Sequence, residues 1–188
     1  ETFKLDKIKF KDDDIFIDLG CNVGVLSCLV AKLNPNIKVY SFDASEISIA
    51  CLRLNCLDNR SPNIQAFNKA VGTENKKDVV FTSNSKEVSC LIEEELNTSE
   101  KRTDIYKCDI INIEEIFDSS LLGINHVKFL KCDIEGGEFK VFNYLFKKRP
   151  DILDRIDNLH MEVHSFVGHQ ELREKIKKRF EKRLINTI

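Results

Sequence analysis

The chain has 188 residues, which fits one compact domain, and 42% of them are hydrophobic. Its 29 basic and 31 acidic side chains leave a formal charge of −2, which disfavours nucleic acid and anionic membrane surfaces as partners. Thirteen Phe, seven Gly and three Pro exclude a disordered chain, and no apolar run approaches the roughly 20 residues of a membrane-spanning helix. With no signal peptide at its start, we expect a single cytoplasmic domain over 1–188.

The predicted elements of the first part alternate between apolar runs and helical patterns, which is typical of βαβ units. In chain order they are a strand at 15–19, a helix at 23–33, a strand at 38–43, a helix at 45–56 and a strand at 64–68. The first run is almost continuously apolar and ends at Gly20, as expected of a buried parallel strand. Ser45 is placed to cap the second helix.

The pattern is interrupted over about 76–103. Short strands at 78–82 and 88–92 predict a β-hairpin inserted into the α/β pattern. The segment 96–103 is polar and lacks apolar periodicity, so we expect it to be mobile.

Order resumes after the insert and leads to a basic amphipathic helix. The predicted elements are a strand at 105–108, a short helix near 113–117, a strand at 127–134, a helix at 138–147, a strand at 159–163, a helix at 170–181 and the start of a last strand at 183–188. In the helix at 170–181, basic residues alternate with Leu172, Ile176 and Phe180, which indicates a docked helix with a solvated outer face. Lys128 and Lys131 flank the strand at 127–134, and we expect both to be solvated. The whole predicts a Rossmann-like α/β fold with a mostly parallel sheet flanked by helices.

The cysteines do not form a metal or disulfide pattern. There are seven, an odd number, without a Cys-x-x-Cys spacing, and the four histidines do not complete a zinc site. We therefore expect reduced thiols that pack as small hydrophobic groups, and no metal.

The first glycine-containing loop follows the first predicted strand and reads Asp18-Leu-Gly20-Cys-Asn22-Val-Gly24. Its spacing differs from the Gly-x-Gly-x-x-Gly of dinucleotide enzymes, which disfavours a nucleotide-dependent oxidoreductase. An acid at the end of the strand suits a ligand with a cationic group. The alternative is a βα turn that binds no ligand.

The second predicted strand ends in Phe42-Asp43. A carboxylate there can accept hydrogen bonds from both hydroxyls of a ribose. The alternative is an acid that caps the helix after Ala44-Ser45. Together with the first loop, Asp43 indicates a nucleoside with a positive appendage, and S-adenosylmethionine (SAM) fits that description.

A second loop, Asp133-Ile-Glu135-Gly-Gly-Glu138, follows the strand at 127–134. Asp133 and Glu135 alternate out of the strand, so both can face the cleft, where a carboxylate could steady a sulfonium or take a proton. Glu138 is expected in the first helical turn, where it favours the helix dipole. His164 follows the next predicted strand and could approach the same cleft.

Five segments together resemble the FkbM family of class I SAM-dependent methyltransferases. They are Asp18-Leu-Gly-Cys-Asn-Val-Gly24, Phe42-Asp43 with Leu52-x-x-Asn55, Asn68-Lys-Ala-Val-Gly72, Phe129-Leu-Lys-Cys-Asp-Ile-Glu-Gly-Gly-Glu138 and Met161-Glu-Val-His164. The resemblance covers about residues 14 to 166 in the family's order. It implies SAM as cofactor and methyl transfer to a hydroxyl of a small molecule or carbohydrate, and it leaves the oligomeric state open. The alternatives are a non-catalytic SAM-binding protein and an N-methyltransferase.

The strand-end positions of Asp133, Glu135 and His164, together with the resemblance, suggest the roles of individual residues, and the sequence also departs from the family's pattern. Asp133 is expected to organise the charged end of SAM, Glu135 to orient the acceptor and His164 to accept its proton. The residues expected to bind the cofactor are Asp18, Gly20, Cys21, Asn22, Gly24, Asp43, Ala44, Asn68, Ala70 and Asp133. Cys21 replaces the usual Ala, and Asp43-Ala44 replaces Glu-Pro. Because the chain stops at Ile188, we expect the C-terminal strand hairpin of the family to be incomplete.

Overall fold

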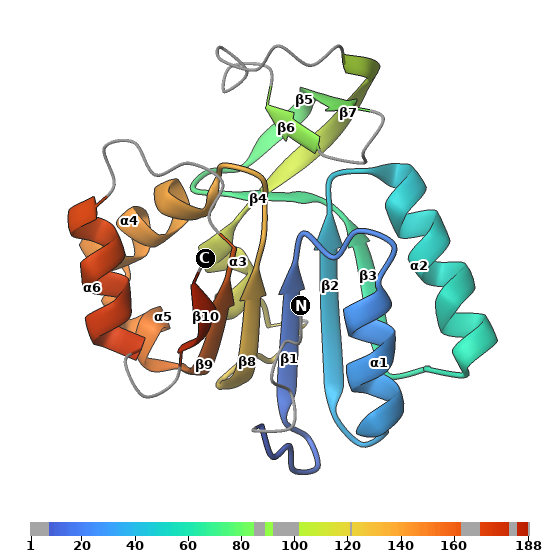
Figure 1. Ribbon diagram of the computed structural model, residues 1–188, viewed down its shortest axis with the longest axis horizontal. Coiled ribbons are helices and arrows are strands. Elements are labelled where there is room, and N and C mark those ends of the chain that lie inside the picture. Colours follow the sequence, from blue (N-terminus) through green and yellow to red (C-terminus); the bar gives the residue numbers. More distant parts are fainter. Residues whose placement is uncertain are drawn as a thin grey trace.

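The structure, a computed structural model, describes residues 8–84, 89–91, 102–120, 122–162, 170–180 and 184–187. In these residues a central sheet has the strand order β10-β9-β8-β1-β2-β3, and every neighbouring pair is parallel (Figure 1). The strands are β1 Ile15–Leu19, β2 Lys38–Asp43, β3 Ile64–Asn68, β8 Val127–Cys132, β9 Ile156–Met161 and β10 Leu184–Thr187. The strand order reverses between β1 and β8, where ligands bind in open α/β sheets.

Helices flank this sheet, as predicted. They are α1 Val25–Leu33, α2 Glu46–Asn59, α3 Ile113–Asp118, α4 Glu138–Lys148, α5 Pro150–Asp154 and α6 Gln170–Phe180. Figure 1 shows α1 and α2 beside β1 to β3, and α4 to α6 beside β8 to β10. The predicted Rossmann-like α/β fold is confirmed, and Ser45 caps α2 by accepting a hydrogen bond from the Ser48 amide at 3.2 Å.

Two expectations at element ends need correction. Pro150 does not only end the preceding helix but opens α5, because proline fits the first turn of a helix. The strand expected at 159–163 begins earlier, at Ile156, and ends at Met161. At the C-terminal side of the chain, the described residues include one strand, β10, which lies parallel to β9.

The insert is larger than a hairpin. The predicted hairpin is confirmed, since Phe81 lies opposite Leu91 in an antiparallel pair. It belongs to a second sheet of β4 Ala70–Gly72, β5 Lys76–Asn84, β6 Ser89–Leu91 and β7 Arg102–Asn112, in the order β4-β7-β5-β6. Of the segment expected to be mobile, 96–101 lie outside the described residues, whereas Arg102 and Thr103 begin β7. Figure 1 shows this sheet above the carboxyl ends of β1 and β8.

Both faces of the central sheet are buried, which explains its continuous apolar strands. On one face, Phe16 and Phe129 stack with ring centroids 5.2 Å apart and pack with Val30 of α1. On the other face, Phe42 and Leu130 join the largest apolar cluster. The sheet is thereby fixed between its helices, and the loops at its carboxyl edge start from rigid positions.

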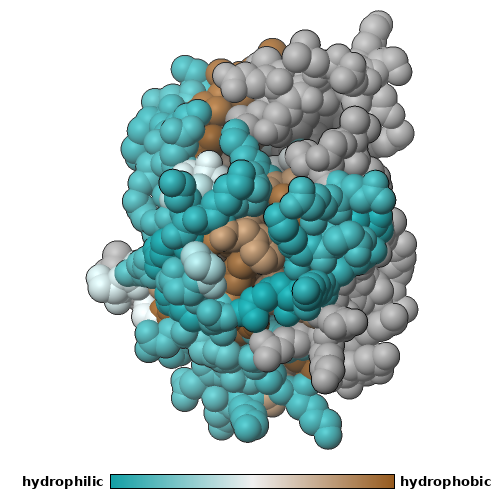
Figure 2. Space-filling view, turned by 90° about the vertical axis from the view of Figure 1, so that its left-hand side faces the viewer, coloured by the Kyte–Doolittle hydropathy of each residue, from teal (hydrophilic) through white to brown (hydrophobic). Residues whose placement is uncertain are grey.

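Helix α6 is docked on this core as its sequence predicts. Ile176 and Phe180 are almost completely buried, and Leu172 packs against the same cluster. The side of the molecule that carries α4 and α6 is mainly hydrophilic in Figure 2, with a small group of hydrophobic residues at its centre. Among the described residues, no helix combines the length and apolar character needed to cross a membrane.

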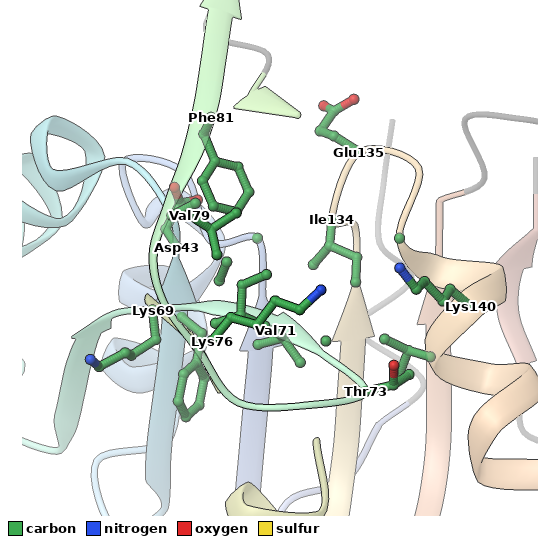
Figure 3. Close-up of a pocket in the computed structure, with 18 of the residues that line it drawn as sticks. Asp43, Lys69, Val71, Thr73, Lys76, Val79, Phe81, Ile134, Glu135 and Lys140 are labelled. Atoms are coloured by element: carbon green, nitrogen blue, oxygen red, sulfur yellow. The ribbon is translucent and has the colours of Figure 1, made fainter. Parts of the chain in front are cut away.

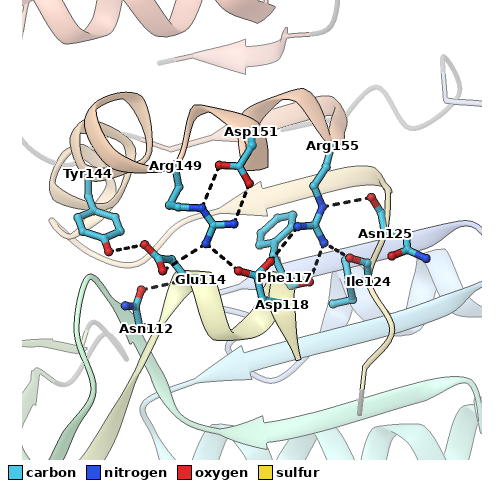
Figure 4. Close-up of polar contacts among 10 residues, drawn as sticks. All are labelled: Asn112, Glu114, Phe117, Asp118, Ile124, Asn125, Tyr144, Arg149, Asp151 and Arg155. Atoms are coloured by element: carbon cyan, nitrogen blue, oxygen red, sulfur yellow. Dashed lines mark hydrogen bonds and ion pairs between the residues drawn. The ribbon is translucent and has the colours of Figure 1, made fainter. Parts of the chain in front are cut away.

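Two arginines join α3 to the segment around α5 (Figure 4). The guanidinium of Arg149 lies 2.7 Å from Asp118 and from Asp151, and 3.2 Å from Glu114. Arg155 contacts Asp118 at 3.0 Å and donates to the backbone carbonyls of Phe117 in α3 and of Ile124 and Asn125 before β8. Asp118 is therefore shared by both arginines, and its hydrogen bond from Arg149 holds the pKa of its carboxyl below the ordinary value, with Arg155 acting in the same direction.

We expect Asp118→Asn to lower the free energy of unfolding by about 0.5–1 kcal/mol near neutral pH, a small effect because the carboxylate is 44% exposed and screened by solvent. Since the pKa is lowered in the folded state, this stabilisation is present above the unfolded pKa of about 3.9 and is lost as the pH falls through the folded value. Urea unfolding of both chains at neutral and acidic pH checks this. Asp58→Asn, an exposed change on α2, is the control, and a stability difference that persists unchanged in acid would contradict the account.

Candidate functional site

A cavity of about 480 Å³ lies at the carboxyl ends of β1, β2 and β8, where the second sheet covers them. Its walls come from the two glycine-containing loops, the end of β2, the second sheet and α4 (Figure 3). The lining residues are Gly20, Asn22, Phe42, Asp43, Ala44, Lys69, Ala70, Val71, Gly72, Thr73, Glu74, Lys76, Val79, Val80, Phe81, Ile110, Asp133, Ile134, Glu135, Gly137, Lys140 and Val141. The cavity therefore coincides with the strand edge at which the sequence places the ligand.

The glycines of the first loop are required by packing within the chain. Gly20 has φ +74°, and a Cβ there would lie 1.7 Å from the carbonyl oxygen of Asp133. Gly24 is the left-handed N-cap of α1, and a Cβ there would lie 2.1 Å from a methyl carbon of Leu52. Of the two, only Gly20 lines the cavity. The loops after β1 and β8 thus touch each other at Gly20 and are positioned together.

Asp43 is held at the end of β2 by two backbone amides. One carboxylate oxygen accepts the Ser45 amide at 2.8 Å at the start of α2, and the other accepts the Asn22 amide at 2.8 Å in the first loop. Burial raises the pKa of this carboxyl against the effect of these two hydrogen bonds. Each carboxylate oxygen has a second lone pair, and the residue lines the cavity, so it can still accept hydrogen bonds from a ligand.

Lys131, which we expected to be solvated, is buried and lies between two acids. Its ammonium donates to the carbonyl oxygen of Gly20 at 2.6 Å and lies 3.4 Å from Asp18 and 3.2 Å from Asp133. The side chain is only 8% exposed. Although burial disfavours the charged form, attraction to Asp18 and Asp133 holds the pKa of Lys131 above its ordinary value. The expectation was wrong because this position of β8 faces the end of β1 and not solvent.

Asp18 is completely buried beneath the cavity. Its second carboxylate oxygen accepts a hydrogen bond from the Ser27 hydroxyl at 2.6 Å, and Ser27 also contacts Ser41 at 2.8 Å. Asp18 is not among the residues that line the cavity. Its carboxylate therefore holds the end of β1 and the ammonium of Lys131.

The second loop is folded around Glu138. The carboxylate of this buried residue accepts the amides of Ile134 at 2.9 Å and Gly136 at 3.0 Å. Glu138 lies in the first turn of α4, as predicted, and these hydrogen bonds to the loop are a further role. Asp133 and Glu135 both line the cavity, and Glu135 has φ +53°, an unusual conformation for a residue other than glycine.

The other predicted cofactor residues fall into two groups. Asn22, Ala44 and Ala70 line the cavity. Cys21 packs below it among Cys28, Ile49 and Leu52, and Asn68 donates its amide to the backbone oxygens of Asp43 and Ala44 at 3.2 and 3.0 Å. The second group thus supports the first loop and the end of β2. His164 lies outside the described residues.

Apart from Ala70 of β4, sequence reasoning missed the part of the wall that comes from the second sheet and α4. Val71, Val79 and Phe81 give an apolar surface, and Lys76 and Lys140 add amino groups. There was little indication of this wall in the sequence, because β4 and β5 are placed at the cavity by pairing with β7, a strand that comes much later in the chain.

Metal ligands do not gather within the part of the chain that the structure describes. No group of three or more His, Cys, Asp or Glu side chains there is placed to hold a metal ion. Cys21, Cys28, Cys51, Cys56, Cys108 and Cys132 are free thiols, and all of them but Cys51 and Cys56 are buried.

Comparison with known proteins gives a family match over most of the chain. The methyltransferase FkbM domain matches residues 18–183. Ribosomal RNA large subunit methyltransferase G of Vibrio vulnificus (strain YJ016) is 41% identical over 58 residues, which are 30% of this chain and 15% of that protein. Ribosomal protein L11 methyltransferase of Oceanobacillus iheyensis is 33% identical over 76 residues, 39% of this chain and 24% of that protein. The matches thus span less than a quarter of these relatives.

Among solved structures, an rRNA methylase of Streptococcus thermophilus is similar with a TM-score of 0.48 and 13% identity. The similarity covers 93% of this chain and 74% of that chain.

Proposed function

The chain belongs to the FkbM methyltransferase family and is a SAM-dependent methyltransferase, and on this premise we propose that it methylates a hydroxyl oxygen of a small molecule or sugar. The observation that carries the proposal is one cavity that joins the Asp43 end to the Asp133–Gly137 loop. A cofactor and a small acceptor can therefore meet within it.

The donor set at the Asp43 end fits the nucleoside part of SAM. Asp43 offers carboxylate lone pairs for ribose hydroxyls, and Ala44 and Ala70 provide small apolar surface beside it. Gly20 and Asn22 of the first loop also line the cavity. When bound, SAM supplies a methyl group activated by its sulfonium charge.

The chain's own residues then orient the acceptor and place negative charge beside the cationic group of the cofactor. Lys131 holds the carboxylate of Asp133 at the cavity wall, where a negative charge favours a cationic ligand. Glu135 lines the same wall and is suited to accept a hydrogen bond from the acceptor hydroxyl. Removal of the hydroxyl proton remains assigned to His164, as the sequence predicts.

We expect Asp43→Ala to weaken SAM binding by about 1.5–3 kcal/mol, the scale of hydrogen bonds to a charged group. Calorimetric titration measures this, with Asp58→Ala on α2 as the matched control and urea unfolding as a check on the fold. The check is needed because Asp43 also holds the Asn22 and Ser45 amides. Unchanged SAM affinity in a folded Asp43→Ala chain would exclude the residue from the cofactor site.

The class of acceptor is tested with SAM labelled with ¹³C in its methyl group. The chain is incubated with hydroxylated small molecules and sugars, with their amine analogues and with ribosomal RNA fragments. We expect label on oxygen of a small acceptor, identified by the NMR chemical shift of the methyl carbon. Label only on nitrogen, or only on RNA, would contradict the proposal. SAM binding without transfer to any of them would favour a non-catalytic SAM-binding protein.

A further inference from the structure

The end of the cavity away from Asp43 has apolar walls and two lysines. Val71 and Ile134 line it, while Lys76 of β5 and Lys140 of α4 extend toward the same space from opposite walls (Figure 3). The side chain of Lys76 is 47% exposed, and Lys140 is exposed. A molecule that enters here therefore meets apolar surface and two ammonium groups that can adjust to it.

The chain's own Glu74 shows that a carboxylate fits beside these lysines. Its oxygen lies 2.8 Å from the ammonium of Lys76, and its pKa is lowered chiefly by that hydrogen bond, with Lys140 contributing from farther away. Glu74 is 61% exposed and lies in the turn between β4 and β5, so it can turn into solvent without breaking a buried contact. Lys140 acts on Glu74 only at longer range, so its charge remains available to a second anion placed beside Lys76.

The other charged groups of the cavity determine how an acceptor is oriented in it. Asp133 and Glu135 line the wall formed by the loop after β8, and they repel an anion placed beside them. Lys69 is paired with Asp109 at 2.6 Å, and in Figure 3 its amino group points away from the space between Lys76 and Lys140. An anionic group is therefore favoured at the two lysines, with a hydroxyl of the same molecule toward the acids.

Resting on the proposed methyl transfer, we propose that the acceptor is a hydroxylated molecule with an apolar body and an anionic group, a carboxylate or a phosphate, that Lys76 and Lys140 bind. Apolar contact with Val71 and Ile134 supplies affinity, and the lysines set the orientation.

The test uses three probes with the same ten-carbon body and terminal hydroxyl: ω-hydroxydecanoate, its primary amide and ω-hydroxydecyl phosphate. Each is titrated calorimetrically into the full chain saturated with S-adenosylhomocysteine (SAH). The carboxylate is expected to bind about five- to tenfold more tightly than the amide, and added salt is expected to reduce this ratio. Tighter binding of the phosphate than of the carboxylate would also support the proposal and identify phosphate as the group.

Three variants locate the effect. Lys140→Met should remove most of the preference for the anion and leave SAH affinity unchanged, whereas Lys148→Met, an exposed change at the other end of α4, should leave both unchanged. Glu74→Gln should strengthen binding of the carboxylate because it removes the competing acid. Equal binding of acid and amide, or no binding of any probe while SAH binds, would overturn the proposal. Failure of SAH itself to bind would contradict the proposed function instead.

Discussion

Lys131→Met is expected to lower the free energy of unfolding by about 3–5 kcal/mol, the usual effect of removing one partner from a buried ion pair. The variant leaves Asp18 and Asp133 close together without the ammonium between them, and Asp18 is almost completely buried. It also removes the hydrogen bond to the Gly20 carbonyl, which joins β8 to the first loop of the site. Such a loss is a large part of the roughly 5–15 kcal/mol of a typical domain.

Urea unfolding of Lys131→Met and of Lys128→Met makes the comparison. Lys128 belongs to the same strand and contacts Asp157 at 3.1 Å, but it lies at the end of β8 that is far from the loops. Lys128→Met should therefore lower the free energy of unfolding by about 1 kcal/mol or less. If Lys131→Met does not fold, Lys131→Arg, which keeps the charge, should fold with weakened SAM affinity. Equal stability of Lys131→Met and the parent would refute the role given to this contact.

His164→Ala is expected to reduce the single-turnover methylation rate by about 10²- to 10⁴-fold, the range of general acid–base catalysis, while SAM affinity is retained. The prediction rests on the sequence and on β9, since Met161 pairs with Cys132 and the Glu162 amide donates to the Cys132 carbonyl at 3.1 Å. The chain after β9 therefore starts at the same edge as the loop that carries Asp133. A neutral imidazole, with a pKa of about 6.5, can accept the proton as the new bond forms.

The pH dependence distinguishes His164 from Glu135. With His164 as the base, the rate should fall as the pH is lowered through the titration of the imidazole, because protonation of the ring removes the proton acceptor. Glu135→Gln should lower the rate at every pH without removing that inflection. A His164→Ala rate within a few-fold of the parent would move the role to Glu135 or to solvent.

The central fold could be predicted because its signals are local. A parallel strand buried on both faces appears as a short apolar run, as at 15–19 and 127–132, and the helices between the strands have a clear apolar spacing. The second sheet could be predicted only in part from the sequence. β7 gains its length from pairing with residues of β5 and β4 that lie 18 to 40 positions earlier in the chain, and such pairing leaves no local pattern.

The cavity could be predicted from the sequence at the ends of β1, β2 and β8 and less well elsewhere. Asp43 and Asp133 could be placed because both follow strands whose ends share one edge of the sheet. The error at Lys131 had a visible signal: a lysine between Leu130 and Cys132, inside a strand buried on both faces, requires a partner of opposite charge. The lysines near the acceptor end could not be assigned, because their place depends on how the second sheet and α4 close the cavity.

The most direct measurement is a calorimetric titration of the unmodified chain with SAM, with SAH and with NAD under the same conditions. We expect SAM and SAH to bind, saturating at one molecule per chain, and NAD not to bind, because the loop from Asp18 to Gly24 lacks the Gly-x-Gly-x-x-Gly spacing of dinucleotide enzymes. Binding of NAD with no binding of SAM or SAH would contradict the assignment of this cavity to a methyltransferase.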